Sequence, residues 1–232
     1  MRGMMVGTNM DFSRQYRIYD PSKSDLDVTI IGAGSTGSFV ALNLAKMGIQ
    51  KIKVIDFDIV EAHNIPNQFY RFSDINKLKV DALGEIIKDF AGIDIIKENI
   101  KIDDDYNFDI NLNSIVILCL DNMEGRELIF KKLKDYPINL IDTRFGGEGY
   151  SVHAVDLGNN KEKEIFSKSL EGEIKETSCG EKGIIYTILS LASEICNIIK
   201  KLDLKEPSPI LLRRELKTYR FIAKMKEAKD GN

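Results

Sequence analysis

Short apolar runs and longer amphipathic stretches follow one another along this 232-residue chain. The apolar runs predict strands at 28–31, 51–55, 93–100, 114–120 and 138–142. Helices are expected from the glycines after the first strand to about 47, and at about 76–90 and 124–135. The run 114–120 is apolar on both faces, as a central parallel strand requires. The repeated order of strand, helix and strand predicts an α/β protein with a doubly wound, mainly parallel Rossmann-like sheet.

The pattern changes in the last third of the chain. Residues 149–157 alternate between apolar and polar positions, which predicts an antiparallel strand outside the parallel set. Residues 161–178 are polar and charged without a firm period, so we expect a mobile loop. An apolar stripe predicts a helix at 183–201, and a strand is favoured at 217–223. The sheet should therefore have a C-terminal antiparallel extension.

Residues 1–27 form a polar lead-in with at most a short helix near 11–16. We expect a single domain over 1–232, with this lead-in, a Rossmann-like core at 28–145 and the extension at 146–232.

Charge and composition exclude several classes of function. The 33 basic and 36 acidic residues leave a net charge of -3, so no nucleic-acid or membrane partner is indicated. The sequence has no apolar run of membrane-spanning length and its first residues lack a signal-peptide core, which predicts a cytoplasmic protein. Three scattered cysteines and two histidines exclude a disulfide framework, a four-thiolate zinc site and a histidine-based metal centre.

The clearest chemical signal is a glycine pattern after the first strand, Gly32-x-Gly34-x-x-Gly37. Such glycines permit a tight turn, close approach of a phosphate and close packing of helix on strand. Asp56 ends the second strand at the distance where a carboxylate accepts hydrogen bonds from a ribose. The alternative is a tight turn that binds nothing, but the flanking strands and Asp56 favour nucleotide binding.

Further motifs are found on both sides of the glycines. They are Arg14-Gln15, Asp56-x-Asp58-x-Val60-Glu61-x-x-Asn64-x-x-Asn67-Gln68, Lys79-Val80, Asp121-Asn122-x-x-x-Arg126 and Cys179-Gly180-x-x-Gly183. In this order they resemble the signatures of the ThiF/MoeB/HesA adenylyltransferases, which are relatives of the ubiquitin-activating enzymes. The resemblance spans roughly residues 12–202.

The resemblance implies an ATP- and Mg²⁺-dependent enzyme that activates the C-terminal carboxylate of a ubiquitin-like or sulfur-carrier protein as an acyl-adenylate. It implies that Lys79 neutralises the phosphates, that Asp121 binds the metal, and that Arg14 reaches the neighbouring subunit of a homodimer. The extension would bind the carrier. The implied nucleotide contacts are Gly32, Gly34, Gly37, Asp56, Asp58, Asn64, Gln68, Lys79, Asp121 and Asn122.

The sequence departs from the family pattern in three respects. Asn67 stands where the family has an arginine, and Arg71 is the candidate replacement. The structural zinc cysteines are absent, and so is a separate large cysteine domain. Cys179 aligns with a loop cysteine that in some relatives forms a thioester or persulfide, although a small residue at a helix entrance would also fit.

Other interpretations remain open from the residues alone. Lys79 could be a solvent-facing lysine, and Asp121 could cap the following helix. The glycine turn alone would also suit an NAD(P)- or FAD-binding oxidoreductase. Asn67 leaves room for a catalytically inactive nucleotide-binding module.

Overall fold

One eight-stranded sheet, in the order β3-β2-β1-β4-β5-β6-β7-β8, runs through the computed structural model, which describes residues 10–171 and 183–227. The strands are β1 (Asp27–Ile31), β2 (Lys51–Ile55), β3 (Ile96–Glu98), β4 (Ser114–Leu118), β5 (Asn139–Gly146), β6 (Gly149–Asp156), β7 (Pro209–Glu215) and β8 (Arg220–Met225). Strands β1 to β5 pair in parallel, and β6 to β8 are added antiparallel. The predicted fold class is confirmed.

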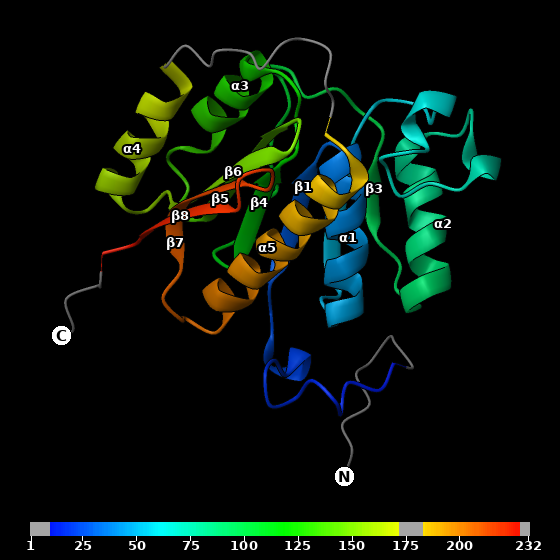
Figure 1. The fold of residues 1–232 in the computed structure, drawn as a ribbon, viewed down its shortest axis with the longest axis horizontal. Helices are drawn as coiled ribbons and strands as arrows, with labels where there is room; N and C mark the ends of the chain where they lie inside the picture. Colours follow the sequence, from blue (N-terminus) through cyan, green and yellow to red (C-terminus); the bar gives the residue numbers. More distant parts are fainter. Residues whose placement is uncertain (1–9, 172–182, 228–232) are drawn as a thin grey trace.

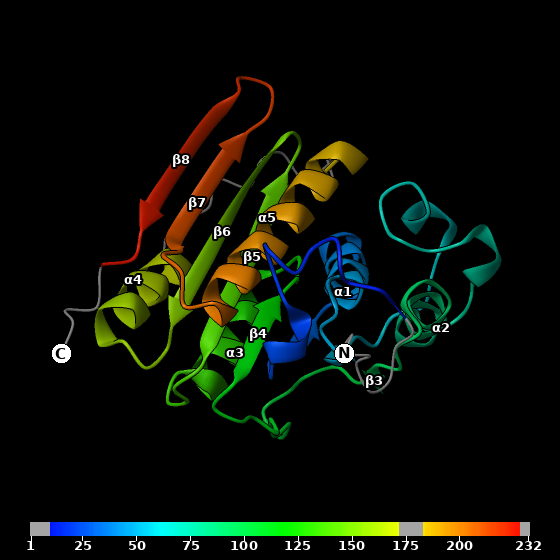
Figure 2. The ribbon, with the colours of Figure 1, turned by 90° about the horizontal axis from the view of Figure 1, so that it is seen from below.

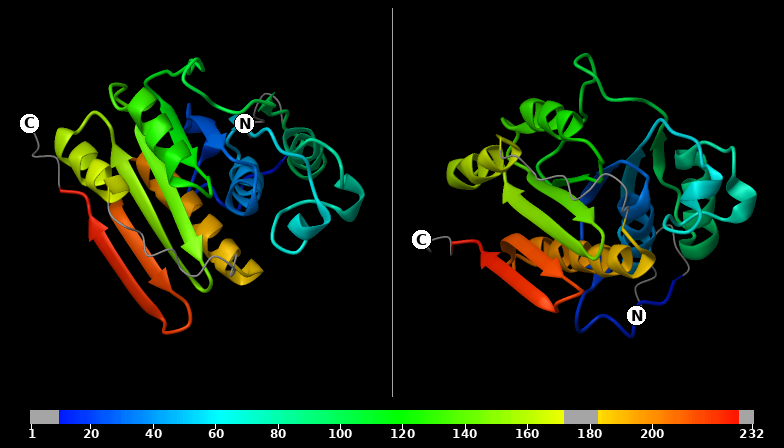
Figure 3. Two further views of the ribbon diagram at one scale, coloured as in Figure 1. Left: turned by 90° about the horizontal axis from the view of Figure 1, so that it is seen from above. Right: turned by 45° about the horizontal axis from the view of Figure 1, so that its top comes forward.

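Helices cover both faces of this sheet (Figure 1). They are α1 (Ser35–Met47), α2 (Lys79–Ala91), α3 (Met123–Leu133), α4 (Asn160–Glu171) and α5 (Ile185–Asp203). Two apolar cores result, one with α1, α2 and α5 and the other with α3 and α4. Figures 2 and 3 show α3 and α4 on the face of the sheet opposite α5. No helix in 10–171 or 183–227 is long and apolar enough to cross a membrane.

The order of the parallel strands determines where a ligand can bind. In register, Ile31 of β1 lies between Ile55 of β2 and Leu118 of β4. The residues that follow these three strands therefore meet at one edge of the sheet. The chain leaves β1 for β2 on one side and later returns to β4 on the other. In open α/β sheets, such a change of direction leaves a crevice at the carboxyl ends of the strands.

The expectation of a mobile loop at 161–178 was wrong for 161–171, which belong to α4, and its remainder at 172–178 lies outside the described residues. The buried residues Glu162, Phe166 and Leu170 recur every four positions, so the helix has an inner face despite its many charges. The Glu162 carboxylate accepts from the Asp156 N–H at 2.7 Å and pairs with Lys226 at 3.0 Å. A nearby backbone N–H and Lys226, which is distant in sequence, thus make a charged residue part of the buried face.

Other boundaries also differ from expectation. The strand expected at 93–100 is reduced to β3. In place of the short helix allowed near 11–16, the lead-in forms hydrogen-bonded turns at 13–18. The strand favoured at 217–223 is confirmed as β8, shifted by a few residues and paired with β7 in a hairpin.

Candidate nucleotide site

The glycine turn between β1 and α1 has the geometry that its sequence predicts. Gly32 has φ +97°, and a Cβ there would lie 2.5 Å from the Cys119 carbonyl oxygen. A Cβ on Gly37 would lie 1.8 Å from the Gly32 carbonyl oxygen, so a larger residue would separate helix from strand. Gly34 precedes α1, and no described side chain caps this helix end. Its first N–H groups are therefore available to an anion.

Asp56 lies against this turn, at the end of β2. Its Oδ2 accepts from the Ala33 N–H at 2.6 Å, and its Oδ1 accepts from the Asp58 N–H at 2.8 Å. Burial raises the pKa of this carboxyl, while these N–H groups and the nearby Lys79 oppose the shift. Each oxygen keeps a lone pair beyond its single bond, so the carboxylate can also accept from a ribose hydroxyl.

Lys79 begins α2, and its ammonium lies 2.8 Å from the Asp58 carboxylate. The two residues are aligned by an antiparallel bridge in which the Lys79 N–H donates to the Asp58 carbonyl at 2.9 Å. The lysine side chain is only 8% exposed and the aspartate side chain 49%. Lys79 is therefore a buried cation beside the glycine turn, which rules out the solvent-facing interpretation.

Tyr70 connects the segment after β2 to the glycine turn and was not found from the sequence. Its hydroxyl donates to the Ala33 carbonyl at 2.6 Å and lies 3.4 Å from the Lys79 carbonyl. Burial, followed by the charge of Asp56, raises the pKa of Tyr70 well above its usual value, so the hydroxyl stays a donor. An isolated tyrosine in a loop gives no pattern from which this contact could be predicted.

Asn64 and Gln68 differ in how their polar atoms are used. The Asn64 side chain accepts from the Glu61 N–H at 2.9 Å, which closes a short helical turn (Ala62–Asn64). Gln68 Oε1 is buried and has no hydrogen-bond partner among the described residues, and the same holds for Thr36 Oγ1 in the first turn of α1. Gln68 Nε2 lies 4.0 Å from the point where a Cβ on Gly34 would stand. Unsatisfied buried polar atoms beside an open glycine turn suit a polar ligand.

Asp121 and Asn122 follow β4 at the same edge. Asn122 is the cap of α3, since its Oδ1 accepts from the Gly125 N–H at 2.8 Å. The interpretation of Asp121 as the cap is therefore wrong. Asp121 is exposed, and its carboxylate accepts from the Asn122 amide at 3.2 Å. No group of three or more metal-ligating side chains occurs among the described residues, so a bound Mg²⁺ would take most of its ligands from phosphates and water.

The remaining predicted site residues lie elsewhere. The Arg71 guanidinium pairs with Asp74 at 3.0 Å, Asp89 at 3.1 Å and Glu85 at 3.3 Å. These three carboxylates occupy it, which does not favour Arg71 as the replacement for the missing arginine. Arg71 was predicted because it is a cation close to Asn67 in the sequence. Its acidic partners, 14 and 18 residues away, could not be identified from that proximity.

Arg14 is exposed at the far end of α1. The neighbouring Gln15 amide donates to the Met47 carbonyl at 2.9 Å, at the last residue of that helix. A 13-residue helix is about 20 Å long, so Arg14 cannot reach the glycine turn of its own chain. Cys179 lies outside the described residues.

A buried charge cluster links β5 to the segment that follows β4. Both oxygens of the fully buried Asp142 are paired, one with Arg126 and the other with Arg144 at 2.6 Å. Arg126 also donates to the Leu120 carbonyl and, at 2.8 Å, to the Thr143 carbonyl. Burial lowers the pKa of Arg126 to about 10, at which it remains charged at neutral pH. The cluster holds the segment that precedes Asp121.

Comparison with known proteins assigns the family. A family model described as "ThiF family" matches residues 15–228. The chain therefore belongs to the ThiF family, which confirms the resemblance of its motifs.

Two curated relatives show the range of the match. The NEDD8-activating enzyme E1 catalytic subunit of Caenorhabditis elegans is 31% identical over 117 residues, which is 50% of this chain and 27% of that protein. The ubiquitin-like modifier-activating enzyme 5 of Drosophila erecta is 30% identical over 144 residues, 56% of this chain and 36% of that protein. This chain thus spans about a quarter to a third of the length of these relatives.

Solved structures share the fold. E. coli MccB superposes with a TM-score of 0.74 at 15% identity, covering 92% of this chain and 68% of MccB. PaaA gives a TM-score of 0.69 at 20% identity, covering 89% of this chain and 74% of PaaA.

Proposed function

We propose that this protein is an ATP-dependent adenylyltransferase that activates the C-terminal carboxylate of a ubiquitin-like or sulfur-carrier protein. The observation that carries the proposal is the buried Lys79, held 2.8 Å from Asp58 beside the glycine turn. A simple dinucleotide site uses glycines and an acidic residue but needs no such cation. The family and its curated relatives, named as activating enzymes of ubiquitin-like proteins, support the same class of reaction.

The chemistry follows from charge. A chain-terminal carboxyl has a pKa of about 3.5 and is ionised at neutral pH, so the enzyme needs no general base. A carboxylate oxygen attacks the α-phosphorus of ATP, the new O–P bond forms, and the bond to the leaving pyrophosphate breaks. The obstacle is repulsion between two anions, which fixed cations and N–H groups offset.

The residues of the site divide this task. The first turn of α1, with Gly32, Gly34 and Gly37 before and within it, would receive the phosphates, and Asp56 would accept from the ribose. Lys79 would turn its ammonium from Asp58 towards the phosphates. Asp121 would hold Mg²⁺, which neutralises phosphate charge when bound. The Gln68 amide oxygen, which has no partner in the described structure, would accept a hydrogen bond from the nucleotide. The side chains of Asn64, Asp58 and Asn122 would act indirectly, by holding neighbouring residues of the site in place.

A second subunit would supply the missing cation. Because Asn67 leaves the site short of one positive charge and Arg14 cannot reach its own glycine turn, we propose a homodimer in which Arg14 completes the partner's site. Light scattering should show a dimer at working concentration, and Arg14→Ala should weaken ATP binding. A monomer that binds ATP as tightly with alanine at position 14 would exclude this arrangement.

The division into a nucleotide-binding core at 28–145 and a carrier-binding extension at 146–232 is likewise a proposal. So is a covalent role of Cys179.

Isothermal titration calorimetry tests the function most directly. We expect the protein to bind ATP with Mg²⁺ and to bind NAD⁺ much more weakly. Binding of NAD⁺ alone would favour the oxidoreductase, for which the glycine turn and Asp56 are the supporting observations. Binding of neither nucleotide would overturn the assigned site.

A further inference from the structure

Tyr70 is a buried residue of the segment after β2, and the proposed reaction gives it no role so far. Its side chain is 7% exposed, and its hydroxyl donates at 2.6 Å to the carbonyl of Ala33, which lies in the glycine turn. The Ala33 N–H donates to Asp56 Oδ2, also at 2.6 Å. Both polar groups of the Ala33 backbone are therefore held, the N–H by a carboxylate and the carbonyl by a hydroxyl.

The bond from Tyr70 fixes the peptide group that joins Ala33 to Gly34. In a trans peptide the carbonyl and the N–H point in opposite directions, and no peptide bond in the described residues is cis. The Gly34 N–H therefore points away from the buried tyrosine. Gly34 itself is partly exposed, and a Cβ placed on it would meet Gln68 Nε2 at 4.0 Å and no closer described atom outside the neighbouring residues. The hydroxyl thus directs this N–H to the open side of the turn.

The glycine is the reason why this peptide needs to be held. A rotation of the Ala33–Gly34 peptide would move the φ of Gly34 from its present -77° to positive values, which glycine adopts readily. Such a rotation would turn the Gly34 N–H towards the buried side of the turn. The Tyr70 hydroxyl opposes the rotation because the rotation would break its bond to the Ala33 carbonyl.

Contacts on both sides of Tyr70 hold its backbone in place. The Phe69 N–H donates at 3.0 Å to the hydroxyl of Ser38, a fully buried residue of α1. The Arg71 N–H donates at 3.0 Å to the carboxylate of Asp74, which is also fully buried. The tyrosine hydroxyl is thus carried by a segment that is tied to the protein immediately before and after it.

We infer that Tyr70 is a positioning residue, whose hydroxyl orients the Ala33–Gly34 peptide so that the Gly34 N–H can donate to a phosphate oxygen of ATP. The hydroxyl also lies 3.4 Å from the Lys79 carbonyl, so the same side chain connects the glycine turn to the start of α2. A donor that is oriented in advance stabilises phosphate charge without a rearrangement during the reaction. The inference rests on the proposed function and adds to it a residue that acts on the nucleotide through the backbone.

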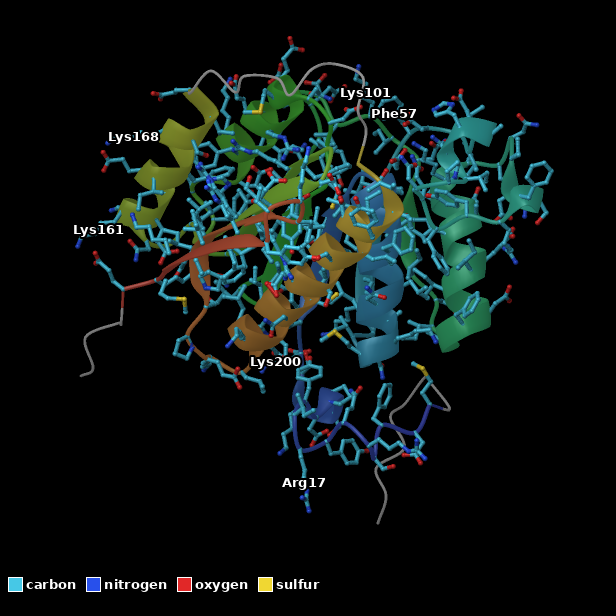
Figure 4. The ribbon with its side chains drawn as sticks, viewed as in Figure 1. Arg17, Phe57, Lys101, Lys161, Lys168 and Lys200 are labelled. Carbon is cyan, nitrogen blue, oxygen red and sulfur yellow. The ribbon has the colours of Figure 1, made fainter. Side chains whose placement is uncertain are left out.

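Tyr19 provides a matched control. Its side chain is 4% exposed, and its hydroxyl donates to the Asp203 carboxylate at 2.7 Å. Asp203 is the last residue of α5, and Tyr19 belongs to the lead-in. Figure 4 shows Phe57, which follows Asp56, and Arg17, two residues before Tyr19, at opposite ends of the molecule. The two tyrosines therefore agree in burial and in hydrogen bonding and differ in their position relative to the site.

The first experiment compares Tyr70→Phe with Tyr19→Phe by calorimetry in the presence of Mg²⁺. The ligands are ATP, inorganic tripolyphosphate, which lacks the nucleoside, and adenosine, which lacks the phosphates. The loss of one neutral hydrogen bond corresponds to a change of about two- to tenfold, so Tyr70→Phe should weaken the binding of ATP and of tripolyphosphate by that factor. Its affinity for adenosine should be unchanged, and Tyr19→Phe should bind all three ligands as the unmodified protein does.

A second measurement needs no ligand. Amide NMR of the unmodified protein should show one sharp signal for Gly34, because the peptide is held in one orientation. In Tyr70→Phe this signal should broaden or double as the peptide takes up both orientations, whereas Tyr19→Phe should leave it unchanged. A single sharp Gly34 signal in Tyr70→Phe, at its position in the unmodified protein, would overturn the inference.

The outcomes separate this inference from the proposed function. If the unmodified protein binds ATP and Tyr70→Phe binds ATP and tripolyphosphate equally well, the positioning role is wrong and the function stands. Equal losses of ATP and adenosine affinity, or the same losses in Tyr19→Phe, would also overturn the role, since the hydroxyl would then support only the fold as a whole. If the unmodified protein binds neither ATP nor tripolyphosphate, the proposed function fails and the inference fails with it.

Discussion

Two groups of opposite charges lie near the carboxyl edge of this sheet, and they differ in how much of their bonding capacity the protein uses. In the buried cluster, both oxygens of Asp142 are paired with arginines, and Arg144 also donates to the Ser169 carbonyl at 3.0 Å and hydroxyl at 3.1 Å. At the site, the Lys79 ammonium has three N–H donors, and within the described residues its one ion pair is with Asp58. The first group is complete within the fold, and the second retains donors for a ligand.

The largest expected effect comes from breaking the buried cluster of Arg126, Asp142 and Arg144. Asp142→Asn removes the negative charge between two buried arginines, and an uncompensated buried charge costs about 3–5 kcal/mol of unfolding free energy. Urea unfolding would measure this loss. The matched control is Asp94→Asn, because the Lys88–Asp94 pair is equally short at 2.7 Å but exposed on both sides. That variant should lose less than about 1 kcal/mol, and a similar loss in both would remove the distinction.

A change to the Lys79–Asp58 pair should affect ATP binding more than the stability of the fold. Lys79→Met keeps the length of the side chain and removes its charge. A hydrogen bond from a charged donor contributes about 1.5–3 kcal/mol, so ATP affinity should fall by about 10- to 150-fold. AMP, which lacks the outer phosphates, should lose much less in calorimetry. Equal losses for ATP and AMP would place Lys79 away from the outer phosphates.

The comparison also shows what sequence can predict. The glycine turn, Asp56 and the parallel strands were predictable because each depends on residues close together in sequence. Lys79 was predicted only through its motif, because its contact with Asp58 joins residues 21 positions apart and depends on an antiparallel bridge between Ile59 and Leu78.

Contacts between residues that are distant in sequence could not be predicted. The cluster of Arg126, Asp142 and Arg144 joins α3, β5 and α4, and no local pattern marks such a contact. Arg71 was considered for the phosphates because its acidic partners on α2 are not apparent from its own segment. In each case, charge was visible in the sequence and its partner was not.

His153 allows the buried cluster to be tested by pH. His153 on β6 stands opposite Asp142 on β5 in the strand register. Burial, with further contributions from the charges of Arg144, Arg213 and Arg126, lowers the pKa of His153 from 6.5 to about 3. The folded state thus keeps His153 neutral while the unfolded state takes up a proton below pH 6.5. Stability is therefore lost as the pH falls from about 6.5 towards 3, by about 2 kcal/mol at pH 5.

His153→Phe removes this titration while keeping a ring next to Phe166, whose centroid lies 5.9 Å from the imidazole. Chemical unfolding at pH 7 and pH 5 should show a smaller pH dependence in the variant than in the unmodified protein, by about the same 2 kcal/mol. An unchanged pH dependence would mean that the imidazole is protonated in the folded state.

The smallest expected effect on stability distinguishes the two residues after β4. Asn122 caps α3 through the Gly125 N–H, so Asn122→Ala should lower the unfolding free energy by about 1 kcal/mol. Asp121 is exposed and is not the cap, so Asp121→Asn should change stability by less than about 0.5 kcal/mol.

The effect of Asp121→Asn should appear instead in a Mg²⁺ titration of ATP binding, because a neutral amide cannot offset the charge of the metal. In the unmodified protein and in Asn122→Ala, Mg²⁺ should strengthen ATP binding, whereas Asp121→Asn should respond more weakly. A normal Mg²⁺ response in Asp121→Asn would mean that the metal is held by phosphates and water without this carboxylate. Asp121 would then have neither a capping nor a metal-binding role.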